Sequence, residues 1–110
     1  MKNNKITTLS SNLQIKELFK NGNTKKNNDF LIKYKKNNVG NLQFAISVNK
    51  KIFRTAVLRN KIKRQIRSII RSFNQVKSID MLVIVLKNYT NNTFELNKNN
   101  ILNTYNQIKQ

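Results

Sequence analysis

The stretch FRTAVLRNKIKRQIRSIIR (Phe53–Arg71) decides the fold, because its apolar residues recur at the spacing of an α-helix. At about 100° per residue, one side of such a helix carries mainly apolar side chains. Thr55 stands directly before the pattern and is a favoured N-cap residue. The stretch therefore predicts an amphipathic helix whose core side carries Leu58, Ile62, Ile66 and Ile69, and Phe73 continues this pattern just beyond the stretch.

The opposite side of this helix is basic in an unusual way. All five arginines of the chain lie between residues 54 and 71, whereas the lysines are scattered along its whole length. Like charges four residues apart, such as Arg67 and Arg71, destabilise a helix, and cations near its N-terminus oppose its macrodipole. Folding alone does not favour this pattern, whereas phosphate binding by guanidinium groups does. Helical geometry places three of these arginines and one asparagine within an arc of about 60°: Asn60, Arg64, Arg67 and Arg71.

Upstream of this helix, the sequence predicts one more helix and two strands. Ser11 and Gly22 have the positions of a helix N-cap and C-cap, with amphipathic spacing between them. Residues 21–28 read as a polar loop, and the segments 30–35 and 42–49 alternate as strands do. One face of the second segment is small and polar, which suits a ligand-contacting surface and an ordinary solvent face equally well: Gln43, Ala45, Ser47 and Asn49.

Downstream, the chain predicts a strand and a last helix. Residues 50–54 read as a connector, and a short strand or bulge within it is left open. The unbroken apolar run 81–86 is typical of a central strand covered on both faces. Residues 92–95 (Asn-Thr-Phe-Glu) form a second candidate capping box, which opens a helix that continues to Ile108. The order α-β-β-(β)-α-β-α predicts an α+β fold.

The composition favours a polyanionic partner. The 110 residues carry 22 basic and four acidic side chains, and nucleic acid relieves the self-repulsion of this +18 net charge. The length predicts one RNA-binding domain over residues 9–110, preceded by a flexible basic tail at residues 1–8. Cysteine, a signal-type segment and an apolar run of roughly 20 residues are all absent, so we expect a cytoplasmic protein without membrane contact.

The sequence favours binding over catalysis. The chain has no His and no Cys, and its four carboxylates belong to separate predicted elements, whereas nucleases that use two metal ions cluster them. A small ribosomal protein shares these properties and is an alternative. A DNA-binding helix-turn-helix protein would need a helix where residues 42–49 alternate as a strand, so we expect no DNA partner.

Residues 50–67, KKIFRTAVLRNKIKRQIR, resemble the signature of the bacterial ribonuclease P protein subunit. That family carries an Arg-Asn-Arg motif followed by Ile-Lys-Arg and a further Arg one turn on, and the spacing agrees here from Arg59 to Arg67. Lys61 departs from the motif, because the family usually has Arg there. Lysine keeps the positive charge but lacks the planar guanidinium group. The resemblance extends over most of the chain.

The resemblance implies a small two-layer α/β sandwich with a left-handed βαβ crossover. It also implies a subunit of a ribonucleoprotein endoribonuclease that removes the 5′ leader of precursor tRNA. The RNA subunit would perform the Mg²⁺-dependent hydrolysis, and the protein would raise affinity for substrate and metal. The central helix and the turn before it would dock on the catalytic RNA through these residues: Lys50, Lys51, Arg54, Arg59, Asn60, Lys61, Lys63, Arg64, Arg67 and Arg71.

The resemblance further implies that a cleft between the first helix and the sheet holds the single-stranded leader. By position, its lining would be Ile15, Phe19, Leu31 and Lys33. Core packing is the alternative role of Ile15 and Phe19. Some relatives place an aromatic residue at the position of Lys33, so either Lys33 or its neighbour Tyr34 faces the cleft. Whether the cleft binds metal is left open.

Overall fold

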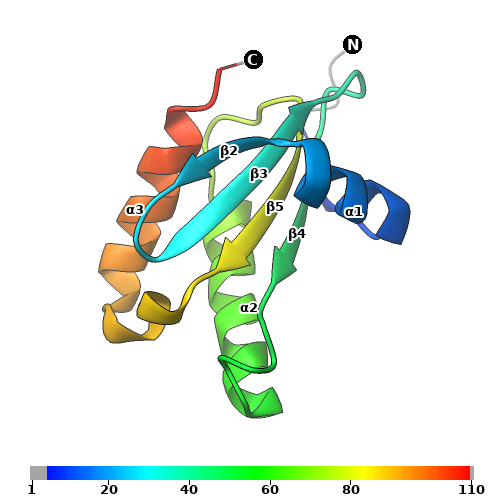
Figure 1. The fold of residues 1–110 in the computed structure, drawn as a ribbon. Coiled ribbons are helices and arrows are strands. Elements are labelled where there is room, and N and C mark those ends of the chain that lie inside the picture. Colours follow the sequence, from blue (N-terminus) through cyan, green and yellow to red (C-terminus); the bar gives the residue numbers. More distant parts are fainter. Residues whose placement is uncertain (1–4, 110) are drawn as a thin grey trace.

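A five-stranded sheet forms the centre of the molecule in the computed structural model, which describes residues 5–109 (Figure 1). Within this range, the order of the strands and helices is roughly the predicted one, and the α+β fold class is confirmed. The strands are β1 (Ile6–Thr8), β2 (Asn23–Lys26), β3 (Phe30–Lys36), β4 (Leu42–Ser47) and β5 (Ile79–Val85). The helices are α1 (Asn12–Asn21), α2 (Ala56–Arg71), the 3-10 helix η1 (Lys87–Asn91) and α3 (Phe94–Asn106).

Strand β5 is the central strand, as its apolar run predicts. The spatial order of the sheet is β1-β4-β5-β3-β2, with β5 parallel to β4 and antiparallel to β3. Met81, Leu82 and Val83 are all buried, although their side chains alternate between the two faces of the sheet. Both faces of β5 are therefore covered, which explains why its sequence does not alternate.

The connection β4–α2–β5 links two parallel neighbours in the unusual, left-handed sense. In Figure 1, α2 lies behind the sheet, β4 and β5 both run downward, and β5 lies to the left of β4. Most crossovers of this kind are right-handed, because that sense suits the twist of the strands. The crossover agrees with the handedness that the family resemblance implies.

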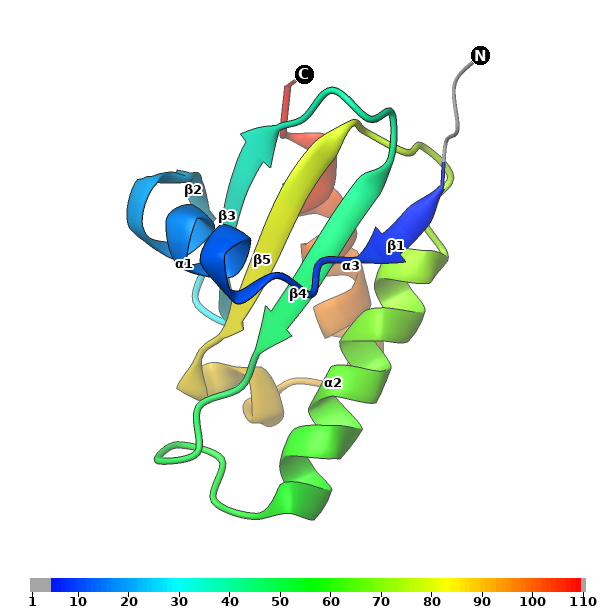
Figure 2. The same cartoon turned by 90° about the vertical axis from the view of Figure 1, so that its right-hand side faces the viewer.

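Helices cover both faces of the sheet (Figure 2). On one face, α2 and α3 pack over β3, β4 and β5 and form the main core, with Ile66, Ile70 and Ile101 fully buried. On the other face, α1 packs over β5 and β3 through a smaller cluster that includes Leu18 and Leu82. Burial contributes about 1.5–3 kcal/mol for each such side chain, so the main core stabilises the fold and α1 is the more lightly held element.

The predicted N-caps of α1 and α2 are confirmed, whereas α3 is capped by Thr93, one residue after the Asn92 that begins its predicted capping box. The side-chain oxygens of Ser11, Thr55 and Thr93 accept hydrogen bonds from the backbone three residues on, at 3.4, 3.1 and 3.2 Å. Gly22 follows α1 and donates its N–H to the carbonyl oxygen of Leu18 at 2.9 Å. A Cβ atom at Gly22 would stand 2.6 Å from that oxygen, so the close approach of the backbone requires glycine here.

Three segments differ from the sequence-based predictions. Residues 6–8 form β1, paired in parallel with β4, so the predicted tail is wrong there; residues 1–4 lie outside the described range. Residues 23–26 form β2 and pair with β3, although residues 21–28 read as a loop. Both strands lie at sheet edges, where short and Lys-rich strands are common, and their patterns carry little periodicity. Residues 50–54 form a turn and no strand.

Lys77 is a buried lysine that closes the C-terminus of α3. Its side chain is 5% exposed, and Nζ donates to the carbonyl oxygens of Tyr105 at 2.9 Å, of Asn106 at 3.3 Å and of Ile108. The last carbonyl groups of a helix carry partial negative charge and lack partners within the helix, so a cation stabilises them. Burial lowers the pKa of Lys77 from its ordinary value because it disfavours the charged ammonium.

Candidate nucleic-acid interface

The orientation of α2 follows from its buried side. Ile62, Ile66, Ile69 and Ile70 are buried against the sheet and α3, which turns the opposite side of the helix toward solvent. The exposed residues of that side are Asn60, Lys61, Arg64, Arg67 and Arg71, and Lys63 is half-buried beside them. We call these six residues the basic face of α2. The structure thus brings together the residues that the helical pattern placed on one arc.

No carboxylate within residues 5–109 forms an ion pair with the arginines of this region. The guanidinium of Arg71 lies 6.0 Å from the centroid of the Phe44 ring, at the outer limit of a cation–π contact. The side chains of Arg64 and Arg67 make no hydrogen bond within this range. The charges of the basic face are therefore not neutralised by the fold, and they are available to an anionic ligand.

Arg59 behaves differently from the other arginines. It is half-buried, and its Nη1 donates to the carbonyl oxygens of Phe53 at 2.9 Å and of Arg54 at 3.1 Å. Helical geometry explains this, because Arg59 lies on the same side of α2 as the buried Ile66 and Ile70. Its guanidinium holds the turn before α2 and is not turned outward with the basic face.

The turn before α2 carries the remaining predicted RNA-binding residues. Lys50, Lys51 and Arg54 are all exposed. The turn is anchored by Phe53, which is 2% exposed and donates its N–H to the carbonyl oxygen of Asn49 at 2.9 Å. A buried ring and the Arg59 bonds therefore fix the backbone from which these three cations project.

A groove lies on the opposite face of the sheet, between α1 and the strands. It encloses about 620 Å³ and is lined by Ile15, Lys16, Phe19, Lys20, Ser47 and Leu82. The Phe19 ring is 60% exposed, so it is not a core residue, whereas Ile15 packs in part against the small core under α1. The groove combines an exposed aromatic ring with two flanking lysines.

The structure places the four predicted cleft residues on one face of the sheet but does not bring all of them into the groove. Ile15 and Phe19 line it. Leu31 and Lys33 pair with Ile84 and Leu82, so they share the α1 face of the sheet, yet they lie outside the lining. Tyr34 points to the other face and packs against the main core, so Lys33, and not Tyr34, is on the groove side.

Sequence reasoning missed four residues of the groove lining: Lys16, Lys20, Ser47 and Leu82. The signal for Ser47 was present, because it belongs to the small polar face of β4. Lys16 and Lys20 each follow a predicted cleft residue along α1, but a solvated lysine and a groove lysine have the same sequence pattern. Leu82 reads as a core residue and is 2% exposed.

Side chains that commonly bind metal ions do not cluster in the described part of the chain. Nowhere in residues 5–109 do three or more His, Cys, Asp or Glu side chains gather. Over the same residues, every helix is too short or too polar to span a lipid bilayer. The chemistry that these surfaces support is binding of phosphate groups and of unpaired bases.

Comparison with protein families gives a match over nearly the whole chain. The model of the family described as Ribonuclease P matches residues 3–109. The ribonuclease P protein component of Mesoplasma florum is 38% identical over 103 residues, which cover 89% of this chain and 89% of the relative. That of Mycoplasma mycoides subsp. mycoides is 42% identical over 87 residues, covering 78% and 77% of the two chains.

Solved structures agree with the sequence relatives. The ribonuclease P protein from Thermotoga maritima superposes with a TM-score of 0.84 at 27% identity, covering 94% of this chain and 98% of that one. The ribonuclease P protein of Staphylococcus aureus gives a TM-score of 0.81 at 27% identity, covering 90% and 92%. The fold of the sheet and its helices is therefore shared with these proteins.

Proposed function

This chain belongs to the ribonuclease P protein family, and we propose that its basic face binds the catalytic RNA while its α1 groove holds the 5′ leader of precursor tRNA. Its function is that of a subunit of a ribonucleoprotein endoribonuclease in tRNA processing. The alternative of a small ribosomal protein is not favoured, because the relatives and structural neighbours are ribonuclease P proteins. We also propose that the protein is located in the cytoplasm and that precursor tRNA is one of its partners.

One observation carries the proposal for the catalytic RNA: the cations of α2 are gathered on one side and left without carboxylate partners. Arg64 and Arg67 are exposed and make no contact with a carboxylate within residues 5–109. A protein that used arginine only for solubility would gain nothing from concentrating it on a rigid helix. Guanidinium groups at fixed spacing suit the phosphates of a folded RNA, which they contact in a bidentate manner.

The α1 groove suits a single-stranded leader. The exposed ring of Phe19 offers a face on which an unpaired base stacks, and Lys16 and Lys20 lie beside it for the backbone phosphates. Stacking on an aromatic ring tolerates any base, so this groove accepts leaders of many sequences.

The chain itself connects the two proposed surfaces. Strand β4 ends at Ser47, which lines the groove, and the turn with Lys50 and Lys51 follows directly before α2. A leader in the groove and a catalytic RNA on the basic face would therefore meet at this turn. This arrangement supports a role in which the protein holds substrate and ribozyme together.

We propose that Mg²⁺ acts with the RNA subunit. The residues described here do not form a carboxylate cluster that fits a protein-bound Mg²⁺ ion, so we assign no ligand and derive no step through the metal. By neutralising phosphates, the cations of the protein reduce the repulsion between the two RNAs, which otherwise requires metal ions.

The test is cleavage of precursor tRNA by ribonuclease P RNA at low Mg²⁺ concentration. We expect this protein to restore removal of the 5′ leader, and the double variant Arg64→Ala/Arg67→Ala to restore it less well because it docks more weakly. Lys26→Ala, which removes an exposed cation from the edge strand β2 and not from the basic face, serves as the control. Equal restoration by the double variant and the native protein would contradict the proposed docking surface.

A further inference from the structure

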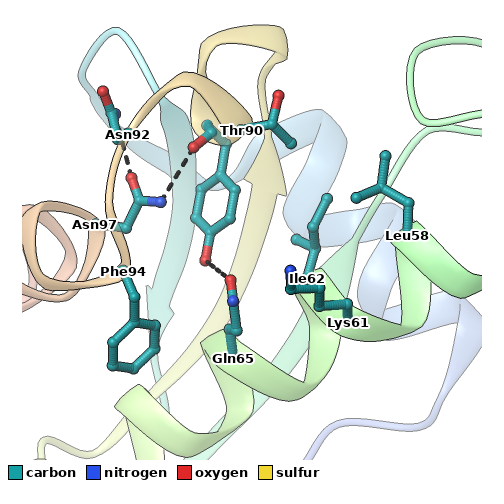
Figure 3. Close-up of a pocket in the computed structure, with 9 residues that line it drawn as sticks. Leu58, Lys61, Ile62, Gln65, Thr90, Asn92, Phe94 and Asn97 are labelled. Carbon is teal, nitrogen blue, oxygen red and sulfur yellow. Dashed lines mark hydrogen bonds between the residues drawn. The ribbon is translucent and has the colours of Figure 1, made fainter.

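A separate cavity lies beside the basic face of α2 and belongs to neither surface described above. It encloses about 190 Å³ between the first half of α2, the 3-10 helix η1 and the start of α3 (Figure 3). Lys61, the motif residue that is usually arginine in the family, lines it and is exposed. The cavity is thus entered from the edge of the basic face.

The polar groups of this cavity are held in a fixed orientation. Tyr89 is 2% exposed, and its hydroxyl donates to Oε1 of Gln65 at 3.2 Å, so the amide nitrogen of Gln65 remains as a donor. Asn97 is 2% exposed; its Nδ2 donates to the carbonyl oxygen of Tyr89 at 3.1 Å. Nδ2 of Asn92 donates to Oδ1 of Asn97 at 3.2 Å, which leaves Oδ1 of Asn92 without a partner within residues 5–109 (Figure 3).

The remaining wall of the cavity is apolar and aromatic. The ring of Phe94 is 39% exposed at the first position of α3, although burial would stabilise it, and Leu58 and Ile62 line the α2 side. An exposed ring beside a free amide donor and an ammonium group is a set of contacts that suits an unpaired base and its phosphate.

We propose that this cavity binds one unstacked nucleotide of the RNA that docks on α2. The base stacks on Phe94, its edge accepts a hydrogen bond from the Gln65 amide nitrogen, and its phosphate contacts Lys61. A nucleotide fits better than a protein side chain because the cavity opens beside the basic face, where a polyanion is expected. The inference rests on the proposed docking of RNA to α2.

A first experiment uses the free protein and the four ribonucleoside 5′-monophosphates, with ribose 5-phosphate as the compound that lacks a base. We expect NMR signals of the Phe94 ring and the Gln65 side-chain amide to shift with at least one nucleotide. Ribose 5-phosphate should shift the signals near Lys61 and leave the Phe94 ring unchanged. Identical shifts with ribose 5-phosphate and all four nucleotides would mean that only phosphate is bound, and would overturn the proposal.

A second experiment measures the affinity of the protein for ribonuclease P RNA after Phe94→Ala. Loss of base stacking should weaken binding about tenfold. Leu96→Ala is the matched control, because Leu96 is 46% exposed on the same turn of α3 and does not line the cavity. Phe94→Leu separates stacking from apolar contact, and it should weaken binding nearly as much as the alanine variant.

The outcomes distinguish this inference from the function on which it rests. If Phe94→Ala binds RNA as tightly as Leu96→Ala while Arg64→Ala/Arg67→Ala binds more weakly, the cavity is rejected and the docking surface stands. If none of these variants changes the affinity, the docking of RNA on α2 is rejected as well.

Discussion

Replacing Arg59 with alanine should loosen the turn before α2 and should not remove a phosphate contact. The guanidinium of Arg59 donates to the carbonyl oxygens of Phe53 and Arg54, at 2.9 and 3.1 Å, and is half-buried. The family resemblance implies that Arg59 is one of several RNA-binding residues. The structure instead gives it a positioning role for the exposed cations Lys50 and Lys51.

The size of the effect follows from the two hydrogen bonds. A bond that involves a charged group contributes about 1.5–3 kcal/mol when buried, and the partial exposure of Arg59 lowers this to about 0.5–1 kcal/mol for each bond. We therefore expect Arg59→Ala to lower the free energy of unfolding by about 1–2 kcal/mol. Arg64→Ala is the control, because Arg64 is exposed and its substitution should change stability by less than about 0.5 kcal/mol.

Two assays on the same variants test this reasoning. Urea unfolding measures the stability, and titration of ribonuclease P RNA at several salt concentrations measures the number of neutralised phosphates. Arg59→Ala should unfold at a lower urea concentration and keep the salt dependence of the native protein. Arg64→Ala should unfold like the native protein and show a weaker salt dependence. The reasoning is refuted if Arg59→Ala unfolds like the native protein and loses salt dependence as Arg64→Ala does.

Three further predictions concern buried and exposed groups elsewhere. Lys77→Met leaves the last carbonyl groups of α3 without their donor, and should lower the free energy of unfolding by about 2–4 kcal/mol in a urea titration, whereas Lys87→Met at an exposed site should not. Burial raises the pKa of Tyr89 to about 12, so the native state keeps a proton that the unfolded chain loses above its ordinary value of 10.0. Stability should therefore fall by up to about 2–3 kcal/mol as the pH rises from 10 to 12, and the difference between the native protein and Tyr89→Phe should shrink over that range. Phe19→Ala should weaken binding of a single-stranded leader oligonucleotide about tenfold, with mature tRNA and the variant Leu13→Ala, exposed on the same helix, as controls.

The strongest periodic segments of the chain predict the fold correctly. The caps at Ser11 and Thr55 and the apolar run of β5 each have a local physical cause, so the sequence alone reveals them. The edge strands β1 and β2 depend instead on backbone pairing with distant strands. Three or four mostly polar residues are too few to show periodicity, so nothing in their local pattern distinguishes a paired strand from a loop.

The candidate surfaces show the same division. The arc on α2 follows from helical geometry, and the structure places Asn60, Arg64 and Arg67 together on the solvent side. The inward position of Arg59 depends on the path of the preceding turn, which no spacing rule describes. The cavity beside Lys61 requires η1 and α3 to meet α2, and this contact between distant segments is visible only in three dimensions.

The measurement that tests the central claim most directly is the salt dependence of binding to ribonuclease P RNA. Each phosphate that the protein neutralises contributes about −0.7 to −0.9 to the slope of log affinity against log salt concentration. Arg64→Ala/Arg67→Ala should therefore make the slope shallower by about 1.4–1.8. A slope that is unchanged in the double variant, or a native protein whose affinity does not depend on salt, would contradict the claim that the basic face of α2 binds RNA.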